Sequence, residues 1–176
     1  MPQKTDIETD FTAEEIVMTG RTPYQGRFEG TSIGDKEAVY RAFSLTKADK
    51  LKDKKFAILS GGEKQKIVIA RAVAQTTPWM LLDEPIASLD IKNQIEIIQT
   101  LSELNRQEGV SVLMVLHDIN LAGIYCDRLI MLKDGQVIAA GNTNECLCEE
   151  NLKKLYDISF FHMDTKKGQR YYYAEI

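Results

Sequence analysis

Leu59-Ser60-Gly61-Gly62-Glu63-Lys64-Gln65 opens the stretch that decides the fold, and Leu81-Leu82-Asp83-Glu84-Pro85 lies shortly after it. Ser60 and Glu63 have the spacing of a capping box, so a helix is predicted from this point to about Gln75. The apolar run Trp79–Leu82, stopped by the Asp-Glu-Pro sequence, predicts a short buried strand. The central feature is therefore a glycine-rich helix start followed by a strand that ends in two carboxylates.

Strands and helices continue to alternate toward the C-terminus. Asp90 is expected to cap a helix that ends at Gly109. Its predicted apolar face consists of Ile91, Ile95, Ile98, Leu101 and Leu104. The next predicted elements are a strand at Val110–Leu116, a helix at Asn120–Tyr125, a hairpin of Arg128–Leu132 and Gln136–Ala139 turning at Asp134-Gly135, and a terminal strand at Tyr171–Tyr173. This order predicts an α/β fold whose sheet is parallel in its middle.

The residues before about Phe56 are predicted to be mainly helical. Thr12 and Glu15 form a second candidate capping box. A longer helix is expected at Asp35–Leu45, burying Val39, Ala42 and Phe43. Lysines between positions 47 and 55 are typical of a solvated connector.

Composition limits the class of protein. The chain has 176 residues, with 22 Lys+Arg against 26 Asp+Glu, a formal net charge of −4 and a pI near 5.3. This length suits one ordinary domain, and the mild acidity gives no general attraction for nucleic acid. Three cysteines are too few for a disulfide scaffold, and no apolar run approaches the ~18 residues of a membrane span. We therefore expect a cytoplasmic protein without nucleic-acid partners.

The helix start at Ser60-Gly61-Gly62 is a candidate phosphate site. Backbone N–H groups of a first helical turn have no partner within the helix and carry the positive end of its dipole. The Ser60 hydroxyl adds a donor. The alternative interpretation is an ordinary helix start, which would show the same capping box.

Asp83, Glu84 and His117 all follow predicted strands of the parallel region. They are therefore expected at the carboxyl edge of the sheet, where ligands bind in open α/β folds. Adjacent strand residues point to opposite sides, so the two carboxylates are expected to have different roles: one can hold Mg²⁺ through its water shell, and the other can reach an attacking water. Histidine at this edge can bond a phosphate oxygen. A polar strand end and a locally bonded loop histidine are the alternatives.

Taken together, these motifs resemble the ATP-binding subunit of ABC transporters. The resemblance rests on the two motifs quoted first, on Ile69-Ala-Arg-Ala72 and Ser88-Leu89-Asp90, and on His117-Asp118, all in the expected order. Phe11–Arg21 and Asp118–Ala122 are similar to the importers of iron-siderophore, haem and cobalamin. Zinc and manganese importers remain an alternative.

The resemblance implies a role for each motif residue. Ser60, Gly61, Gly62 and Glu63 match the signature motif, which contacts the γ-phosphate of ATP held by the opposite subunit. Asp83 matches the aspartate that assists Mg²⁺, Glu84 the general base, Asp90 the loop that crosses the dimer interface, and His117 the switch histidine. Gln3 resembles the Q-loop glutamine that touches Mg²⁺. Glu63 stands where the family usually has Gln, and Ile86 where it usually has Thr.

One expected motif has no counterpart in the sequence. A P-loop needs Gly-x-x-x-x-Gly-Lys-[Ser/Thr], and no Gly-Lys dipeptide occurs. The expected fold is therefore an ABC ATPase domain of the P-loop NTPase type without its N-terminal strands and P-loop. Residues 1–56 would form the Q-loop and helical subdomain, and residues 57–176 the C-terminal part of the ATPase core. An exposed apolar sheet face, with marginal stability or aggregation, should follow.

The functional expectation follows from the resemblance. The chain would be an ATPase subunit that uses ATP and Mg²⁺ to power import of a metal chelate, on the inner face of the membrane. Its partners would be a second copy in a head-to-tail homodimer, two transmembrane permease subunits and, indirectly, a substrate-binding protein. Because the P-loop motif is absent, this chain alone would be inactive and would not bind Mg-ATP tightly. The alternative is a non-catalytic fragment that acts as a permease-docking or interaction module.

Overall fold

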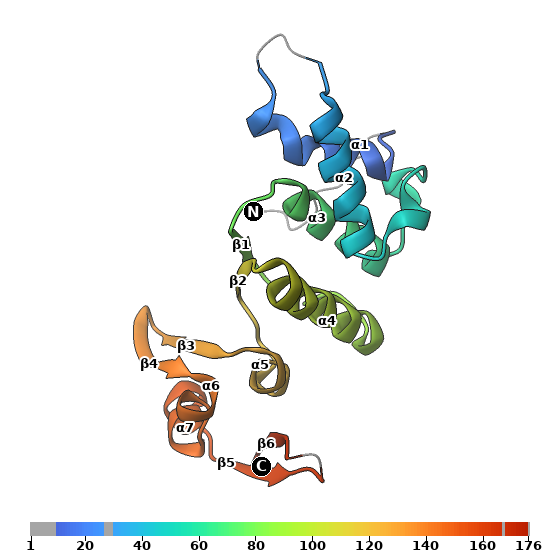
Figure 1. Ribbon diagram of the computed structural model, residues 1–176. Helices are drawn as coiled ribbons and strands as arrows, with labels where there is room; N and C mark the ends of the chain where they lie inside the picture. Colours follow the sequence, from blue (N-terminus) through green and yellow to red (C-terminus); the bar gives the residue numbers. More distant parts are fainter. Residues whose placement is uncertain (1–9, 27–29, 167, 176) are drawn as a thin grey trace. The chain divides into compact units, whose positions relative to one another are not determined.

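The computed structural model describes residues 10–26, 30–166 and 168–175, which form two compact units (Figure 1). The first unit ends at Val115 and the second begins at Leu116. The first contains α1 (Ala13–Met18), η1 (Thr19–Tyr24), α2 (Ile33–Leu45), η2 (Asp49–Leu51), η3 (Phe56–Ile58), α3 (Gly61–Ala74), β1 (Trp79–Leu82), α4 (Ile91–Glu108) and β2 (Ser111–Met114). The second contains α5 (Ile119–Tyr125), β3 (Arg128–Lys133), β4 (Gln136–Asn142), α6 (Thr143–Cys146), α7 (Glu149–Tyr156), β5 (Phe160–Asp164) and β6 (Arg170–Ala174).

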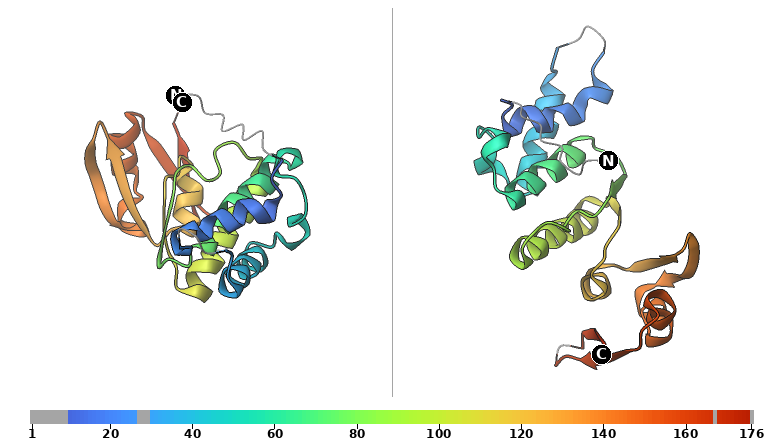
Figure 2. Two further views of the ribbon diagram at one scale, coloured as in Figure 1. Left: turned by 90° about the horizontal axis from the view of Figure 1, so that it is seen from above. Right: turned by 180° about the vertical axis from the view of Figure 1, so that it is seen from behind.

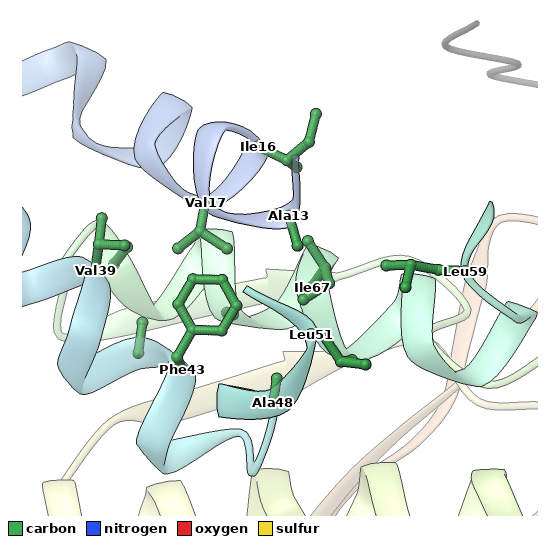
Figure 3. Close-up of a cluster of buried hydrophobic side chains, with 12 residues drawn as sticks. Ala13, Ile16, Val17, Val39, Phe43, Ala48, Leu51, Leu59 and Ile67 are labelled. Carbon is green, nitrogen blue, oxygen red and sulfur yellow. The ribbon is translucent and has the colours of Figure 1, made fainter. Parts of the chain in front are cut away.

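The core of the first unit lies where α1 and α2 pack against α3 (Figure 3). Phe43 fills the centre of this cluster, between Val17 of α1 and Val39 of its own helix. The remaining buried members are Ala13, Ile16, Ala42, Ala48, Leu51, Leu59, Ile67, Ala70 and Ala74. Burial of Val39, Ala42 and Phe43 confirms the apolar face predicted for the second helix.

Local capping interactions begin these helices where the sequence predicted. Thr12 and Ser60 each accept a hydrogen bond from the backbone N–H three residues on, completing capping boxes with Glu15 and Glu63. The helix predicted from Asp35 begins slightly earlier, because Ser32 caps it and Asp35 is the third residue of its first turn. Each cap supplies partners for amides that the helix itself leaves unpaired.

The strands form three separate pairs. β1 and β2 are parallel, with Leu81 opposite Leu113, which confirms the parallel middle of the α/β fold. The hairpin β3–β4 and the terminal pair β5–β6 are antiparallel and belong to sheets of their own among the described residues. Asp134 and Gly135 both have positive φ in the hairpin turn, which suits the right-handed twist of its strands.

One face of the β1–β2 pair is apolar and exposed. Leu81 is 73% exposed and Leu113 is 52% exposed, whereas Met80, on the opposite face of β1, is only 5% exposed. Trp79 lies on the same exposed face, two residues before Leu81 in β1, and Val115, just after the end of β2, is also exposed. The exposed apolar sheet face expected from the sequence is therefore present.

Helix α4 departs from its predicted apolar face at one end. Ile98, Leu101 and Leu104 are buried, but Ile91 is 75% exposed because it is the first residue of the helix. Gly109 ends the helix with φ 67°, a left-handed conformation that glycine adopts without a steric penalty. Figure 2 shows α4 from two further directions. No helix of the described residues is long and apolar enough to cross a membrane.

The second unit is built around Tyr172 and Leu152. These two side chains are buried with Met131, Cys146 and Leu147. The Tyr172 hydroxyl donates to the Leu147 carbonyl, and the backbone N–H of Tyr172 donates to Asn120 Oδ1 at 2.8 Å. Tyr171–Tyr173 lies within β6, as predicted.

Candidate functional site

The start of α3 presents Ser60, Gly61 and Gly62. The Ser60 N–H donates to Glu63 Oε2 at 2.9 Å, and the Glu63 N–H donates to Ser60 Oγ at 3.4 Å. The hydrogen bond from the Ser60 N–H, followed by the Ser60 hydroxyl, lowers the pKa of the Glu63 carboxyl group, and Lys54 Nζ, 3.3 Å from its other oxygen, adds to the effect. Glu63 is therefore a carboxylate that completes the helix start. The N–H groups of the glycines that follow Ser60 are suited to an anion.

Asp83 and Glu84 lie just beyond the last residue of β1, and both are exposed. Neither residue belongs to the strand, so the separation of the two carboxylates expected from strand alternation stays a prediction. Glu84 instead has φ 45°, a left-handed backbone conformation that is uncommon for a residue with a Cβ atom. Such conformations concentrate at functional sites, where surrounding structure holds them. The backbone at Glu84, rather than the pleat, therefore sets the direction of its side chain.

Asp90 caps α4 after the turn that follows Glu84. Its Oδ1 accepts from the Asn93 N–H at 2.9 Å, and its Oδ2 accepts from Asn93 Nδ2 at 2.7 Å. The backbone hydrogen bond from Asn93, followed by the side-chain one, lowers the pKa of Asp90. Gln94 Nε2 donates to the Ile86 carbonyl at 3.3 Å, which ties the preceding turn to the same helix.

The starts of α3 and α4 lie in contact. A Cβ atom on Gly62 would overlap the Asn93 side chain, lying 2.5 Å from its Cγ and 3.0 Å from its Nδ2. A Cβ atom on Gly61 would be 3.8 Å from Leu89 Cδ2. The structure thus brings together Ser60, Gly61, Gly62, Glu63 and Asp90, five of the sequence-predicted site residues.

The structure does not place two of the predicted site residues with this group. His117 is exposed and belongs to the second unit, immediately before Asp118, which caps α5. Gln3 lies outside the described residues. The roles expected for His117 and Gln3 therefore stay predictions.

Asp83 is the described residue expected to serve a magnesium ion. No group of three or more His, Cys, Asp or Glu side chains in the described part of the chain could hold a metal by itself. Magnesium usually keeps several waters and binds through one or two carboxylates together with substrate phosphates. A single exposed carboxylate at a strand end fits an ion of that kind, held mainly by nucleotide and water.

Comparison with known proteins agrees with this arrangement. The family model described as ABC transporter matches residues 1–87. The ferric enterobactin transport ATP-binding protein FepC of Escherichia coli (strain K12) is 38% identical over 164 residues, which are 93% of this chain and 60% of FepC. The achromobactin transport ATP-binding protein CbrD of Dickeya dadantii (strain 3937) is 37% identical over 169 residues, 92% of this chain and 63% of CbrD.

A solved structure shows the same fold. It is described as an inward-facing conformation of an ABC transporter of metal-chelate type, and it superimposes with a TM-score of 0.92 at 26% identity. The match covers 99% of this chain and 70% of that one. The chain therefore spans roughly three fifths of the curated relatives named above.

The fold is that of ABC ATPase domains, and over nearly its whole length the chain is similar to the ATP-binding subunits of ABC transporters. Among these, it is similar to the subunits named for the transport of ferric enterobactin and achromobactin.

Sequence reasoning missed Asn93. Its position three residues after Asp90 marks it as a partner in the helix cap, a spacing that the sequence does show. Its contact with Gly62 joins residues 31 positions apart (93 − 62 = 31), so no local pattern could have indicated it.

Proposed function

We propose that this chain acts as the ATP-binding and ATP-hydrolysing subunit that powers import of a metal chelate, such as an iron-siderophore, through a membrane permease. The observation that carries the proposal is the contact of the Ser60–Glu63 helix start with the loop that ends at Asp90. In this arrangement, the helix start supplies backbone N–H groups and the Ser60 hydroxyl, and the loop that ends at Asp90 lies next to them. The names of the relatives support the class of cargo. Haem, cobalamin, zinc and manganese are the other cargoes that the sequence leaves open.

The residues divide the proposed chemistry among them. Ser60 Oγ and the N–H groups of Gly61 and Gly62 would donate to the γ-phosphate of ATP held by a second subunit. Glu84 would accept the proton of a water aligned with that phosphate. Bound Mg²⁺ would offset the phosphate charge, with Asp83 and Gln3 as its protein-side partners.

The proposed assembly has two copies of the ATPase arranged head to tail on two permease subunits, at the inner face of the membrane. A substrate-binding protein would deliver the cargo to the permease. Within each composite site, Asp90 would lie at the interface between copies. His117 would bond the γ-phosphate from the ATP-holding subunit.

The second candidate is a docking module without ATP turnover. The 176 residues of the sequence include no P-loop lysine, which is the group that reaches the β- and γ-phosphates, so ATP turnover would need one supplied from outside them. The two candidates make different demands on Glu84. Only the ATPase needs its carboxylate.

A chimera separates the two candidates. The N-terminal segment of FepC that precedes its match to this chain would be fused ahead of Met1, and Mg-ATP hydrolysis measured for the chimera and for the unfused chain. The ATPase proposal expects hydrolysis by the chimera that the Glu84→Gln substitution abolishes, and no tight ATP binding by the unfused chain. A folded chimera that binds ATP but shows no Glu84-dependent hydrolysis would instead establish the docking module.

A further inference from the structure

The contact between Gly62 and Asn93 gives Asn93 two partners in different loops. Asn93 Nδ2 donates to Asp90 Oδ2 at 2.7 Å, while the same amide group packs against the Cα of Gly62, where a Cβ would overlap it. Gly62 is buried, whereas Ser60 and Gly61 beside it are exposed. The amide of Asn93 therefore fills the space between the helix start at Ser60 and the cap at Asp90.

The neighbouring contacts hold the two helices in register. One turn further along each helix, Lys66 Nζ bonds Glu96 Oε2 at 2.8 Å, and this bond lowers the pKa of Glu96. Leu89 reaches toward Gly61 from the loop side. A slide of one helix start along the other would break the ion pair and expose the glycine that Asn93 covers.

We propose that Asn93 is a positioning residue that fixes the spacing between the Ser60–Glu63 turn and the Asp90 loop. In the ATPase, which is the proposed function on which this role rests, the two motifs would then approach the nucleotide of the second subunit as one body. The contacts of Asn93 are with the protein itself, at Asp90 and Gly62. It acts through Gly62 and Asp90.

The structure provides a matched pair of glycine substitutions to test the contact. Gly62→Ala adds a methyl group whose three nearest atoms all belong to the side chain of Asn93, whereas Gly61→Ala adds one at ordinary van der Waals distance from Leu89. Gly62→Ala should shift the amide NMR signals of Ser60 and Asp90 together. Gly61→Ala should leave the Asp90 signal within the line width.

Removal of the Asn93 side chain should uncouple the two loops. In an Asn93→Ala background the atoms that the new methyl group would meet are gone, so Gly62→Ala should no longer move the Asp90 amide signal. Gly62→Ala should lower the urea concentration at the unfolding midpoint in the natural chain. In the Asn93→Ala background, the same substitution should no longer lower it. Asn105→Ala, which removes an asparagine at the far end of α4 that donates to the Val110 carbonyl, is the control and should give no rescue.

Two results would overturn the positioning role. The first is that Gly62→Ala, made alone, leaves the amide NMR signal of Asp90 unchanged. The second is that Gly62→Ala lowers stability equally in the natural chain and in the Asn93→Ala background. If Gly62→Ala does not fold in the natural chain, recovery of folding in the Gly62→Ala/Asn93→Ala double variant but not in Gly62→Ala/Asn105→Ala gives the same comparison. These measurements need no nucleotide, so the positioning role of Asn93 can be tested independently of the proposed ATP hydrolysis. In the chimera, Asn93→Ala should lower kcat at least fivefold with little change in KM for ATP, whereas Asn105→Ala should change neither.

Discussion

Arg21 and Asp35 form an ion pair that joins three elements of the first unit. Arg21 Nε donates to Asp35 Oδ1 at 2.9 Å, and the two side chains are only 11% and 6% exposed. Arg21 also donates to the carbonyl of Ala74 at 2.8 Å, while Asp35 Oδ2 accepts from the Ser32 N–H at 3.0 Å. One carboxylate thus completes the cap of α2 and orders the arginine that reaches the end of α3.

Replacing Asp35 with Asn should destabilise the chain at neutral pH, with a clear fall in melting temperature. The Arg21 guanidinium, followed by Ser32, lowers the pKa of Asp35 from its ordinary value of 3.8. When folding lowers the pKa of a carboxyl group, the charged group stabilises the folded state at any pH above its pKa in the unfolded chain. This stabilisation disappears as the pH falls through the lower pKa of the folded state. The difference in unfolding free energy between the natural chain and Asp35→Asn should therefore shrink below about pH 4.

Urea unfolding at pH 7 and at pH 3 measures this difference. Asp134→Asn is the control, because Asp134 is exposed in the β3–β4 turn with φ 50°, a conformation that asparagine adopts readily. A pH-independent difference for Asp35→Asn would contradict the assignment of the stabilisation to its charge.

Gly20 should not tolerate a side chain. A Cβ atom there would overlap the carbonyl oxygen of Arg71 in α3 and lie 3.3 Å from the carbonyl carbon, and backbone atoms cannot rotate away. Overpacking of this kind typically costs about 1–3 kcal/mol, so Gly20→Ala should lower the unfolding free energy by that order. Gly34→Ala is the matched control, since its nearest atom is Ser32 Oγ at 3.8 Å.

Gly34→Ala should in fact stabilise the chain by about 0.5–1 kcal/mol, because alanine is the better residue within a helix. Chemical unfolding of both variants should show a lower unfolding free energy for Gly20→Ala and a higher one for Gly34→Ala. Equal effects of the two substitutions would mean that η1 does not approach α3 as closely as Gly20 indicates.

The local features of this fold could be read from the sequence, whereas the long-range ones could not. Thr12 and Ser60 were identified as caps because their capping-box partners lie only three residues away, and Asp90 because it directly precedes a helical apolar pattern. The pairing of Arg21 with Asp35 has no such signal, since it depends on how η1 and α2 pack. The separation of the strands into three pairs likewise depends on packing. Hydrophobic alternation indicates where strands lie in the sequence, but it does not indicate which strands pair with one another.

In the candidate site too, local features could be predicted from the sequence, whereas long-range contacts could not. The helix start at Ser60 and the carboxylates at Asp83 and Glu84 were found from motifs. The left-handed backbone of Glu84 was not, because a glutamate gives no indication of positive φ. The contact of Gly62 with Asn93 also required the structure.

Ser60→Ala should affect both stability and catalysis. Loss of an N-cap hydroxyl typically costs about 1 kcal/mol, and Ser60 Oγ accepts the Glu63 N–H here. Ser32→Ala is a matched change, because Ser32 is the capping residue of another capping box, at the start of α2. Both variants should lose similar stability, but only Ser60→Ala should also lower ATP hydrolysis by the chimera. Equal hydrolysis by the two variants would remove Ser60 from the proposed nucleotide contacts.

The exposed face of β1 and β2 should make the chain associate with itself. Leu81 and Leu113 are opposite one another in register and both are exposed, so their side chains contribute little to the chain's own core. Contiguous exposed apolar surface beside unpaired strand edges is a site of association. The unfused chain should therefore form dimers or larger species at micromolar concentration.

Threonine at both positions should reduce that association while leaving the unfolding midpoint nearly unchanged, because threonine suits a strand and carries a polar group. Sedimentation velocity over a range of concentrations measures the association, and urea unfolding at the lowest concentration measures the stability. Met80→Thr is the control on the opposite face, where Met80 is buried. That substitution should lower stability by about 1–3 kcal/mol, because it removes buried apolar surface and places a hydroxyl in the core. If the Leu81 and Leu113 substitutions instead destabilise the chain as much as Met80→Thr, this face is covered by the chain's own residues in solution.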